Sequence, residues 1–254
     1  MKIVRINFEG HRRFGILKGS TIKLLDGAPY RGINLTKERV PTKDAKLLAP
    51  CAPTKIIGLG LNYYDHAKEL GMTLPTSPLT FLKPSTSVIG PDAEIIYPST
   101  SHRVDYEGEL AVIIKKHAWR VSKEDALKYV LGYSCFNDVT ARDLQNSDSQ
   151  WTRAKGFDTF AAVGPCIETE LDPTDVLVET YLNGKGKQSG SSNNMIYSVA
   201  DVINFITHVM TLLPGDIIAM GTPSGIGPMY PSDTVEVKIK PIGTLRNKVA
   251  DNNK

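Results

Sequence analysis

The apolar residues of this chain occur in short runs that glycine and proline interrupt. The runs Lys55-Ile-Ile-Gly-Leu59 and Leu110-Ala-Val-Ile-Ile114 are rich in aliphatic, partly β-branched residues and have the length of single strands. The 21 glycines and 16 prolines among the 254 residues favour turns over the interiors of helices. This pattern predicts an α+β fold that is β-rich and has only short helices.

The first 49 residues are predicted to form a small β domain. Three short strands are expected, at residues 3–8, 13–18 and 21–25. The turn Lys18-Gly-Ser-Thr21 has the glycine-first form of a two-residue hairpin. Pro41, Pro50 and Pro53 favour extended backbone at the residues before them, which disfavours a helix. We therefore expect a domain boundary here, with a small domain at 1–49 and a larger one at 50–254.

Three helices are predicted in the larger domain. One is expected to begin at Asn62 as its cap and to stop at Gly71. A second is expected over residues 123–131, and a third over 198–213. In the third, apolar residues recur at helical spacing, and Ser198-x-x-Asp201 forms a capping pattern at its start.

The overall composition argues against several classes of protein. The net charge is only +3 and no dense block of lysine and arginine occurs, so nucleic-acid binding is not expected. No apolar run approaches the ~20 residues that span a bilayer, and the N-terminus alternates polar and apolar residues unlike a signal peptide. The three cysteines, Cys51, Cys135 and Cys166, lack the spacing of a zinc site. We expect a cytoplasmic protein without a membrane partner.

Three acidic residues form the most informative chemical pattern. Glu107 and Glu109 are two residues apart beside an apolar strand, so both side chains are expected on one face. Two close carboxylates repel each other unless a cation compensates, and Asp138 has the right chemistry for a third oxygen ligand. The alternative is a solvated strand face on which these acids pair with Lys115 and Lys116.

Other polar residues are candidates for catalysis. His66 and Glu69 are three residues apart on the first predicted helix, where a carboxylate can orient a histidine that acts as a general base. Lys155 precedes an apolar run and could place a cation beside an anionic substrate. For each of these residues the alternative is an exposed, solvated side chain.

Two further segments carry polar side chains, and one of them follows Asp138. Arg142 and Gln145 follow it by four and seven residues, so a helix that starts near Val139 would project all three side chains from one side. The alternative is a polar helix face. Gly221-Thr-Pro-Ser-Gly225 is a turn, and turns of this composition are more often structural than catalytic.

Taken in chain order, six segments resemble the fumarylacetoacetate hydrolase family over about residues 50–245. They are Gly-Leu-Gly-Leu-Asn-Tyr-Tyr-Asp-His-Ala-Lys-Glu (58–69), Phe-Leu-Lys-Pro (81–84), Asp-Tyr-Glu-Gly-Glu-Leu (105–110), Asn-Asp-Val-Thr-Ala-Arg-Asp-Leu-Gln (137–145), Ala-Lys-Gly-Phe (154–157) and Gly-Thr-Pro-Ser-Gly (221–225). The resemblance implies the family's β-rich roll with short flanking helices, a catalytic role for the larger domain, and a homodimer. The small N-terminal domain resembles the extension of many prokaryotic members.

The resemblance also implies roles for individual residues. It implies Mg²⁺ or Mn²⁺ as cofactor, with Glu107, Glu109 and Asp138 as ligands. Larger animal-type members have a further Asp ligand before the histidine, where this chain offers only Asn62 and Asp65. By the same resemblance the catalytic residues are His66, Glu69 and Lys155, and the residues around the substrate are Arg142, Gln145 and Thr222.

The function implied is hydrolysis of a C–C bond in a small acylpyruvate-type 2-oxo acid, through a metal-bound pyruvate enolate. His66, polarised by Glu69, would deprotonate water, and Lys155 would offset the developing negative charge. The alternative on the same site is a decarboxylase or isomerase of oxaloacetate-like or 2-hydroxy-diene-dioate substrates. A non-catalytic module that binds metal or ligand is a third reading, against which the His66–Glu69 pair argues.

Overall fold

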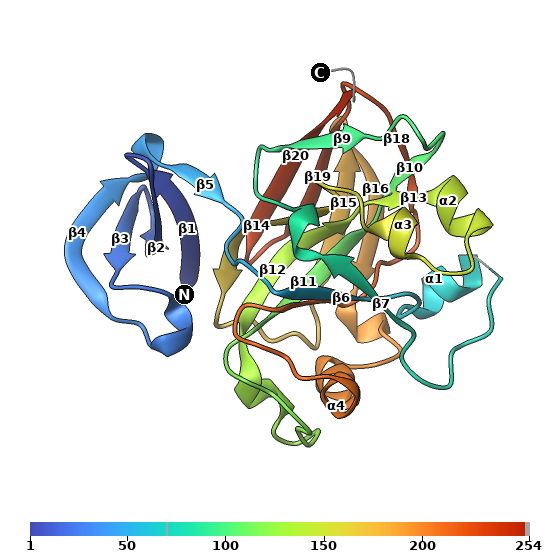
Figure 1. Cartoon of the computed structure of the whole chain (residues 1–254), viewed down its shortest axis with the longest axis horizontal. Coiled ribbons are helices and arrows are strands. Elements are labelled where there is room, and N and C mark those ends of the chain that lie inside the picture. Colours follow the sequence, from blue (N-terminus) through green and yellow to red (C-terminus); the bar gives the residue numbers. More distant parts are fainter. Residues whose placement is uncertain (70, 252–254) are drawn as a thin grey trace.

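Strands dominate the computed structural model of the chain, which describes residues 1–69 and 71–251 (Figure 1). The largest sheet has twelve strands: β1 (Lys2–Phe8), β2 (His11–Lys18), β3 (Thr21–Leu25), β4 (Leu35–Pro41), β5 (Lys46–Leu48), β6 (Lys55–Leu59), β7 (Thr80–Pro84), β8 (Val88–Ile89), β11 (Gly108–Ile114), β12 (Val130–Asp138), β14 (Ala161–Glu168) and β17 (Ile217–Ala219). Its order is β4-β3-β2-β1-β14-β12-β11-β17-β6-β7, with β5 paired to β1 and β8 to β14.

Two smaller sheets complete the β structure. One has the order β16-β15-β19-β20-β9 and contains β9 (Glu94–Tyr97), β15 (Leu177–Leu182), β16 (Lys185–Ser191), β19 (Thr234–Ile239) and β20 (Gly243–Asp251). The other has the order β13-β10-β18 and contains β10 (Val104–Tyr106), β13 (Thr140–Ala141) and β18 (Gly227–Met229). The expectation of a β-rich α+β fold is confirmed.

The helices of the described residues are short. They are α1 (Tyr64–Glu69), α2 (Arg142–Ser147), α3 (Thr152–Lys155) and α4 (Val199–Val209). Single turns of 3₁₀ helix occur at Pro29–Arg31, Thr42–Asp44, Ser85–Ser87, Ala126–Tyr129 and Ser192–Asn194. Within residues 1–69 and 71–251, no helix is long and apolar enough to cross a membrane.

The central strand β11 is buried on both faces, which explains its unbroken apolar sequence. Leu110 and Val112 belong to the same core as residues of the five-stranded sheet, including Val178. The alternate residues Ala111 and Ile113 belong to a second core on the other face. Because successive side chains of a strand point to opposite faces, a strand between two cores needs apolar residues throughout.

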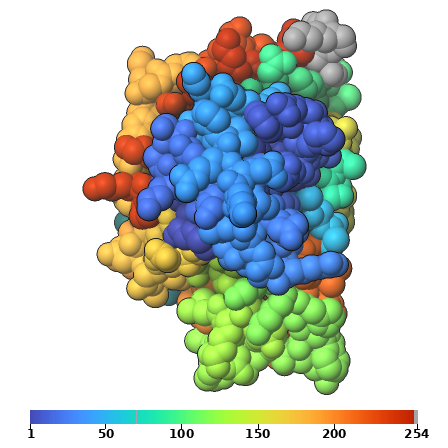
Figure 2. Space-filling view, turned by 90° about the vertical axis from the view of Figure 1, so that its left-hand side faces the viewer, coloured from blue at the N-terminus to red at the C-terminus, as the bar shows by residue number. Residues whose placement is uncertain are grey.

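The N-terminal strands form a lobe on one side of the molecule (Figure 1), and Figure 2 views the molecule from the side of this lobe. The three strands predicted there are confirmed as β1, β2 and β3. The β1 strand also pairs with β14, with Lys2 opposite Glu168 and Ile3 opposite Ile167. The main sheet therefore continues from the lobe into the larger body, and the domain boundary at residue 49 stays a prediction.

The predicted helix over residues 123–131 is wrong. Only Ala126–Tyr129 form a 3₁₀ turn, and β12 starts at Val130. At the start of this segment, Ser122 accepts a hydrogen bond from the Asp125 amide at 3.3 Å. Pairing of β12 with β11 and β14 takes precedence over local helix propensity here.

Two other predicted helices begin or end differently from expectation. The helix that holds Arg142 starts at Arg142 itself and not near Val139, because Asp138 ends β12 and β13 follows it. The α4 helix has the expected capping box of Ser198 and Asp201 but ends at Val209. In the first helix, α1, the prediction of a short helix is confirmed. However, Asn62 does not cap it, since its side chain bonds to Tyr197 and Met220 instead.

Candidate metal centre and active site

Three carboxylates converge in the interior of the protein. Ligand oxygens of Glu107, Glu109 and Asp138 all lie within 4.8 Å of one another. Glu107 occupies the break between β10 and β11, Glu109 lies in β11, and Asp138 is the last residue of β12. These residues are 6%, 1% and 1% exposed, so the alternative of a solvated strand face is wrong.

The register of β11 and β12 explains this convergence. Gly108 lies opposite Asn137, which places Asp138 beside Glu107 on the neighbouring strand. The Asp138 amide donates to the Glu107 carbonyl at 2.9 Å, and the Glu107 amide donates to the Asn137 side chain at 3.0 Å. The backbone therefore fixes how close the carboxylates stand.

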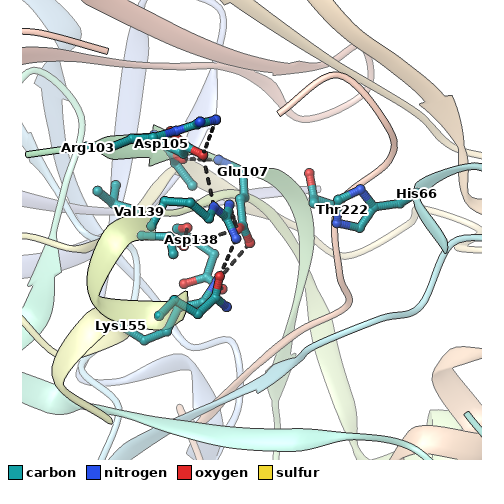
Figure 3. A network of polar contacts seen from close by, with 12 residues as sticks. His66, Arg103, Asp105, Glu107, Asp138, Val139, Lys155 and Thr222 are labelled. Carbon is teal, nitrogen blue, oxygen red and sulfur yellow. Dashed lines mark hydrogen bonds and ion pairs between the residues drawn. The ribbon is translucent and has the colours of Figure 1, made fainter. Parts of the chain in front are cut away.

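A buried lysine, Lys155, links two of these carboxylates (Figure 3). Its Nζ lies 2.8 Å from Oε2 of Glu107 and 2.6 Å from Oδ2 of Asp138. Burial by itself would lower the pKa of Lys155, but Asp138 and Glu107 outweigh that effect and raise the pKa. The same ammonium, together with Arg142, outweighs the burial of Glu107 and holds the pKa of this carboxyl well below its usual range. The alternative of an exposed lysine is wrong.

A second buried lysine, Lys83, was assigned no role from the sequence. It lies in β7, forms an ion pair with Asp138 and donates to the Val139 carbonyl at 3.1 Å. Burial lowers its pKa, while the charge of Asp138 opposes that effect. The available signal was a lysine inside a short, otherwise apolar strand segment, where a charged side chain needs a buried partner.

Arginine side chains extend the network toward solvent. Asp105 is fully buried and accepts from Arg103 Nε at 2.9 Å (Figure 3) and from Arg142 Nε at 2.9 Å. Arg142 also contacts Glu107 and Gln145. Arg142 and Gln145 thus lie on one side of α2, as the spacing predicts, whereas Asp138 belongs to β12 and not to the same helix.

His66 and Glu69 form the pair expected from their spacing. His66 Nδ1 lies 2.9 Å from Oε2 of Glu69, and His66 is 4% exposed. The other oxygen of Glu69 accepts from the Gly225 amide at 2.9 Å. With Nδ1 bonded to a carboxylate, the Nε2 atom of a neutral imidazole is the one left to accept a proton.

The loop at residues 221–225 contacts both groups of residues. The Gly221 amide donates to Oε2 of Glu109 at 2.9 Å, and the Thr222 hydroxyl donates to the Gly108 carbonyl at 2.9 Å. The proton of this hydroxyl is therefore used within the protein, and the substrate-binding role of Thr222 stays a prediction. The structural role expected of the turn is visible in these bonds.

A cavity of about 570 Å³ joins the histidine to the carboxylate network. Six of the predicted site residues line it: His66, Glu69, Glu107, Arg142, Gln145 and Lys155. The remaining lining residues are Gly60, Leu61, Met72, Leu79, Arg103, Asn146, Trp151 and Ile226. The cavity is therefore of small-molecule size and is lined by a candidate general base and by the cationic side chains of Arg103, Arg142 and Lys155.

The carboxylates have the chemistry of a divalent-cation site. Burial and the nearby charges of Asp138 and Glu107 raise the pKa of Glu109 well above its usual range. Within residues 1–69 and 71–251, Glu109 has no lysine, arginine or histidine at ion-pair distance, and Gly221 supplies an amide only. A hard cation with oxygen ligands, such as Mg²⁺, would compensate this charge. The three residues therefore fit the predicted metal.

Comparisons with known proteins agree with this fold. The family model described as fumarylacetoacetate (FAA) hydrolase C-terminal matches residues 55–250. A second model, described as Rv2993c-like, N-terminal, matches residues 1–50. The first match covers most of the chain and includes every residue of the candidate site.

Three named proteins illustrate the range of similar enzymes. The mitochondrial oxaloacetate tautomerase FAHD2A of Homo sapiens is 36% identical over 223 residues, which are 83% of this chain and 71% of that protein. The 2-hydroxyhepta-2,4-diene-1,7-dioate isomerase structure from Mycobacterium marinum is 40% identical, covers 100% of both chains and has a TM-score of 0.94. The fumarylacetoacetate hydrolase structure from Exiguobacterium antarcticum is 37% identical, covers 99% of this chain and 100% of that chain, and has a TM-score of 0.88. The chain therefore belongs to the fumarylacetoacetate hydrolase family and is an enzyme.

Proposed function

We propose that this enzyme hydrolyses a C–C bond in a small acylpyruvate-type 2-oxo acid and depends on a divalent metal. The observation that carries the proposal is the His66–Glu69 pair, with an Nδ1–Oε2 distance of 2.9 Å, on the same cavity as Glu107 and Lys155. A protein that only bound a ligand would need no general base. The proposed metal is Mg²⁺ or Mn²⁺ on Glu107, Glu109 and Asp138.

The protein's own residues account for the proton transfers. Nε2 of His66 takes a proton from water, and the hydroxide adds to the distal carbonyl of the substrate. The C–C bond then breaks, its electron pair forms the enolate of pyruvate, and His66 returns the proton to the enolate carbon. Glu69 keeps Nδ1 protonated, and Lys155 offsets the negative charge that develops. A divalent ion, when bound, would supply charge that holds the 2-oxo acid and favours its enolate.

A second candidate function is isomerisation or decarboxylation through the same enolate, without attack by water. The names of two similar proteins favour it, since one is an oxaloacetate tautomerase and the other a dienedioate isomerase. Here His66 would move a proton between carbon or oxygen atoms of the substrate itself. The surrounding cations, Lys155 and Arg142, would serve both reactions equally.

A substrate panel separates the two candidates. The protein is loaded with Mg²⁺ or Mn²⁺ and incubated with acylpyruvates, with oxaloacetate and with a 2-hydroxy-dienedioate. Release of pyruvate together with a carboxylic acid supports hydrolysis. Enol–keto conversion or loss of CO₂ without hydrolysis of any acylpyruvate supports the second function. Turnover that persists unchanged after chelation of divalent ions contradicts the metal dependence in both.

A further inference from the structure

Gln188 lies outside the cavity and next to the segment that carries the candidate metal ligands Glu107 and Glu109. All of its side-chain hydrogen-bonding groups have partners. It belongs to β16 of the five-stranded sheet and is 3% exposed. Its Oε1 accepts from the Gly108 amide at 2.9 Å, and its Nε2 donates to the Thr222 hydroxyl at 2.7 Å and to the Pro223 carbonyl at 2.8 Å. An amide side chain buried this fully, with its oxygen and both of its donors used, is held in one orientation.

The hydrogen bonds of Gln188 and Thr222 hold the two peptide groups that lie between Glu107 and Glu109. The Gly108 amide belongs to the peptide that joins it to Glu107, and the Gly108 carbonyl belongs to the peptide that joins it to Glu109. Gln188 holds the first peptide, and Thr222, which itself accepts from Gln188, holds the second at 2.9 Å. A side chain at position 108 would place its Cβ 2.0 Å from Thr180 Oγ1, so only glycine allows this approach.

The same bonds reach the catalytic pair through the loop at 221–225. This loop donates to Glu109 from Gly221 and to Glu69 from Gly225, each at 2.9 Å. Ser224 also donates to Asp65 of α1, with an Oγ–Oδ2 distance of 3.0 Å. Gln188 donates hydrogen bonds to Thr222 and Pro223 in the middle of this loop. The hydrogen bonds of Gln188 and of this loop therefore connect Glu107 and Glu109 with helix α1, which carries His66.

We propose that Gln188 is a positioning residue that sets the spacing of Glu107 and Glu109 and ties the His66–Glu69 pair to them. It touches neither the substrate cavity nor a reacting atom, and it acts through Gly108 and Thr222. Outer partners that orient metal ligands typically change metal affinity or activity by about 10- to 100-fold when they are replaced. The inference deepens the proposed function and rests on its metal centre.

Replacement of Gln188 tests its positioning role directly. Gln188→Met keeps the size of the side chain but removes all three hydrogen bonds. We expect the Kd for Mn²⁺, measured by electron paramagnetic resonance without substrate, to rise by about 10-fold or more. With a substrate from the panel, kcat should fall by a larger factor than KM rises, because the base and the metal ligands lose their alignment.

Asn247→Leu is the matched control. Asn247 is another buried amide of the same sheet, in β20, and its side chain donates to the carbonyls of Gly90 and Ala93 at 3.0 and 2.8 Å. Its loss should lower the melting temperature but leave the Kd for Mn²⁺ unchanged. If Gln188→Met does not fold, Gln188→Glu takes its place. This variant keeps the acceptor for Gly108 and loses the donors, so we expect a smaller change in Kd and a fall in kcat.

The outcomes for Gln188 and for the proposed reaction are separable. A folded Gln188→Met or Gln188→Glu protein whose Kd for Mn²⁺ and kcat both match the parent overturns the positioning role. A parent protein that binds no Mn²⁺ overturns the metal centre and this role together. If the parent binds Mn²⁺ but turns over no substrate of the panel, the proposed reaction fails, and the Mn²⁺ titration alone decides the role of Gln188.

Discussion

At the scale of single residues, His66 has the most demanding role in the proposed reaction, since it must take and return a proton. We expect His66→Ala to lower kcat by roughly 10²- to 10⁴-fold, the usual contribution of a general base. Binding of Mn²⁺ should not change, because the three carboxylates come from other elements. Steady-state kinetics and an Mn²⁺ titration measure both effects.

Glu69→Gln refines the same prediction. The amide can still contact Nδ1, but it lacks the charge that stabilises a protonated imidazole, so kcat should fall by less than in His66→Ala. If His66→Ala hydrolyses an acylpyruvate at the parent rate, another group activates the water. A decarboxylase that relies mainly on the metal would retain much of its turnover without His66.

Lys83 supplies a second prediction at this scale, since it is one of the cations that balance the carboxylates. Lys83→Met should lower the free energy of unfolding of the metal-free protein by about 3–5 kcal/mol, because Asp138 loses a buried partner. Saturating Mg²⁺ should recover part of this loss, since the ion would compensate the same carboxylate. Thermal unfolding with and without Mg²⁺ measures the difference, and an equal loss in both conditions would contradict a metal beside Asp138.

At the scale of elements, α1 has too few residues to be stable alone. Its six residues fall below the ~12–15 at which isolated helices persist. Asp65 and Glu69 attach it to Ser224 and Gly225 of the loop. We expect the amides of Tyr64–Glu69 to exchange faster with solvent in the metal-loaded protein than after addition of oxalate, a mimic of the pyruvate enolate. Equal hydrogen exchange with and without oxalate would contradict the expectation that α1 becomes more ordered when a ligand binds.

The elements also show which features the sequence could predict. Strands β6 and β11 follow from short apolar runs, and α4 follows from helical spacing with a Ser198–Asp201 capping box. The 123–131 segment has apolar residues at helical spacing, yet its last residues pair with β11 and β14 as part of β12. Local sequence patterns therefore predict elements that hydrophobic burial or a helix cap stabilises. They fail where pairing between strands distant in sequence determines the secondary structure.

The candidate site divides in the same way. Acidic residues and the i, i+3 pair of His66 and Glu69 carry local signals, and the structure brings them together as expected. Lys83 and Gln188 belong to no such local pattern, because their partners lie on strands that they do not pair with. Lys83 reaches Asp138 from β7, and Gln188 of the five-stranded sheet reaches Gly108 of the largest sheet. The lysine in its short apolar strand indicates a buried partner, but only the packing of distant strands identifies that partner as Asp138.

At the scale of the whole molecule, the N-terminal lobe and the larger body share structure. Ile3 is fully buried in a core with Phe136 and Ile167, and the N-terminal ammonium pairs with Glu168 at 2.5 Å. Removal of residues 1–49 would expose this core and remove the β1 partner from one edge of the end of β14. Because exposing one buried isoleucine costs about 1.5–3 kcal/mol, and each kcal/mol shifts the melting temperature by about 2–4 °C at this size, the melting temperature of the 50–254 fragment should fall by at least about 3 °C.

Two alanine variants of the full chain test whether the lobe and the body unfold together. Ile3→Ala alters a contact between them. Ile22→Ala alters β3, where Ile22 is buried and lies opposite Leu17 of β2 and Val40 of β4, both strands of the lobe. Each should cost about 2–5 kcal/mol. If the chain unfolds as one unit, both variants lower the same single calorimetric transition. An independent lobe would instead melt separately in Ile22→Ala and leave the transition of the larger body in place. That outcome, like an unchanged melting temperature of the 50–254 fragment, would make residue 49 a true boundary between domains. Shared unfolding would mean that the lobe stabilises the strand β14, which pairs directly with the Asp138 end of β12.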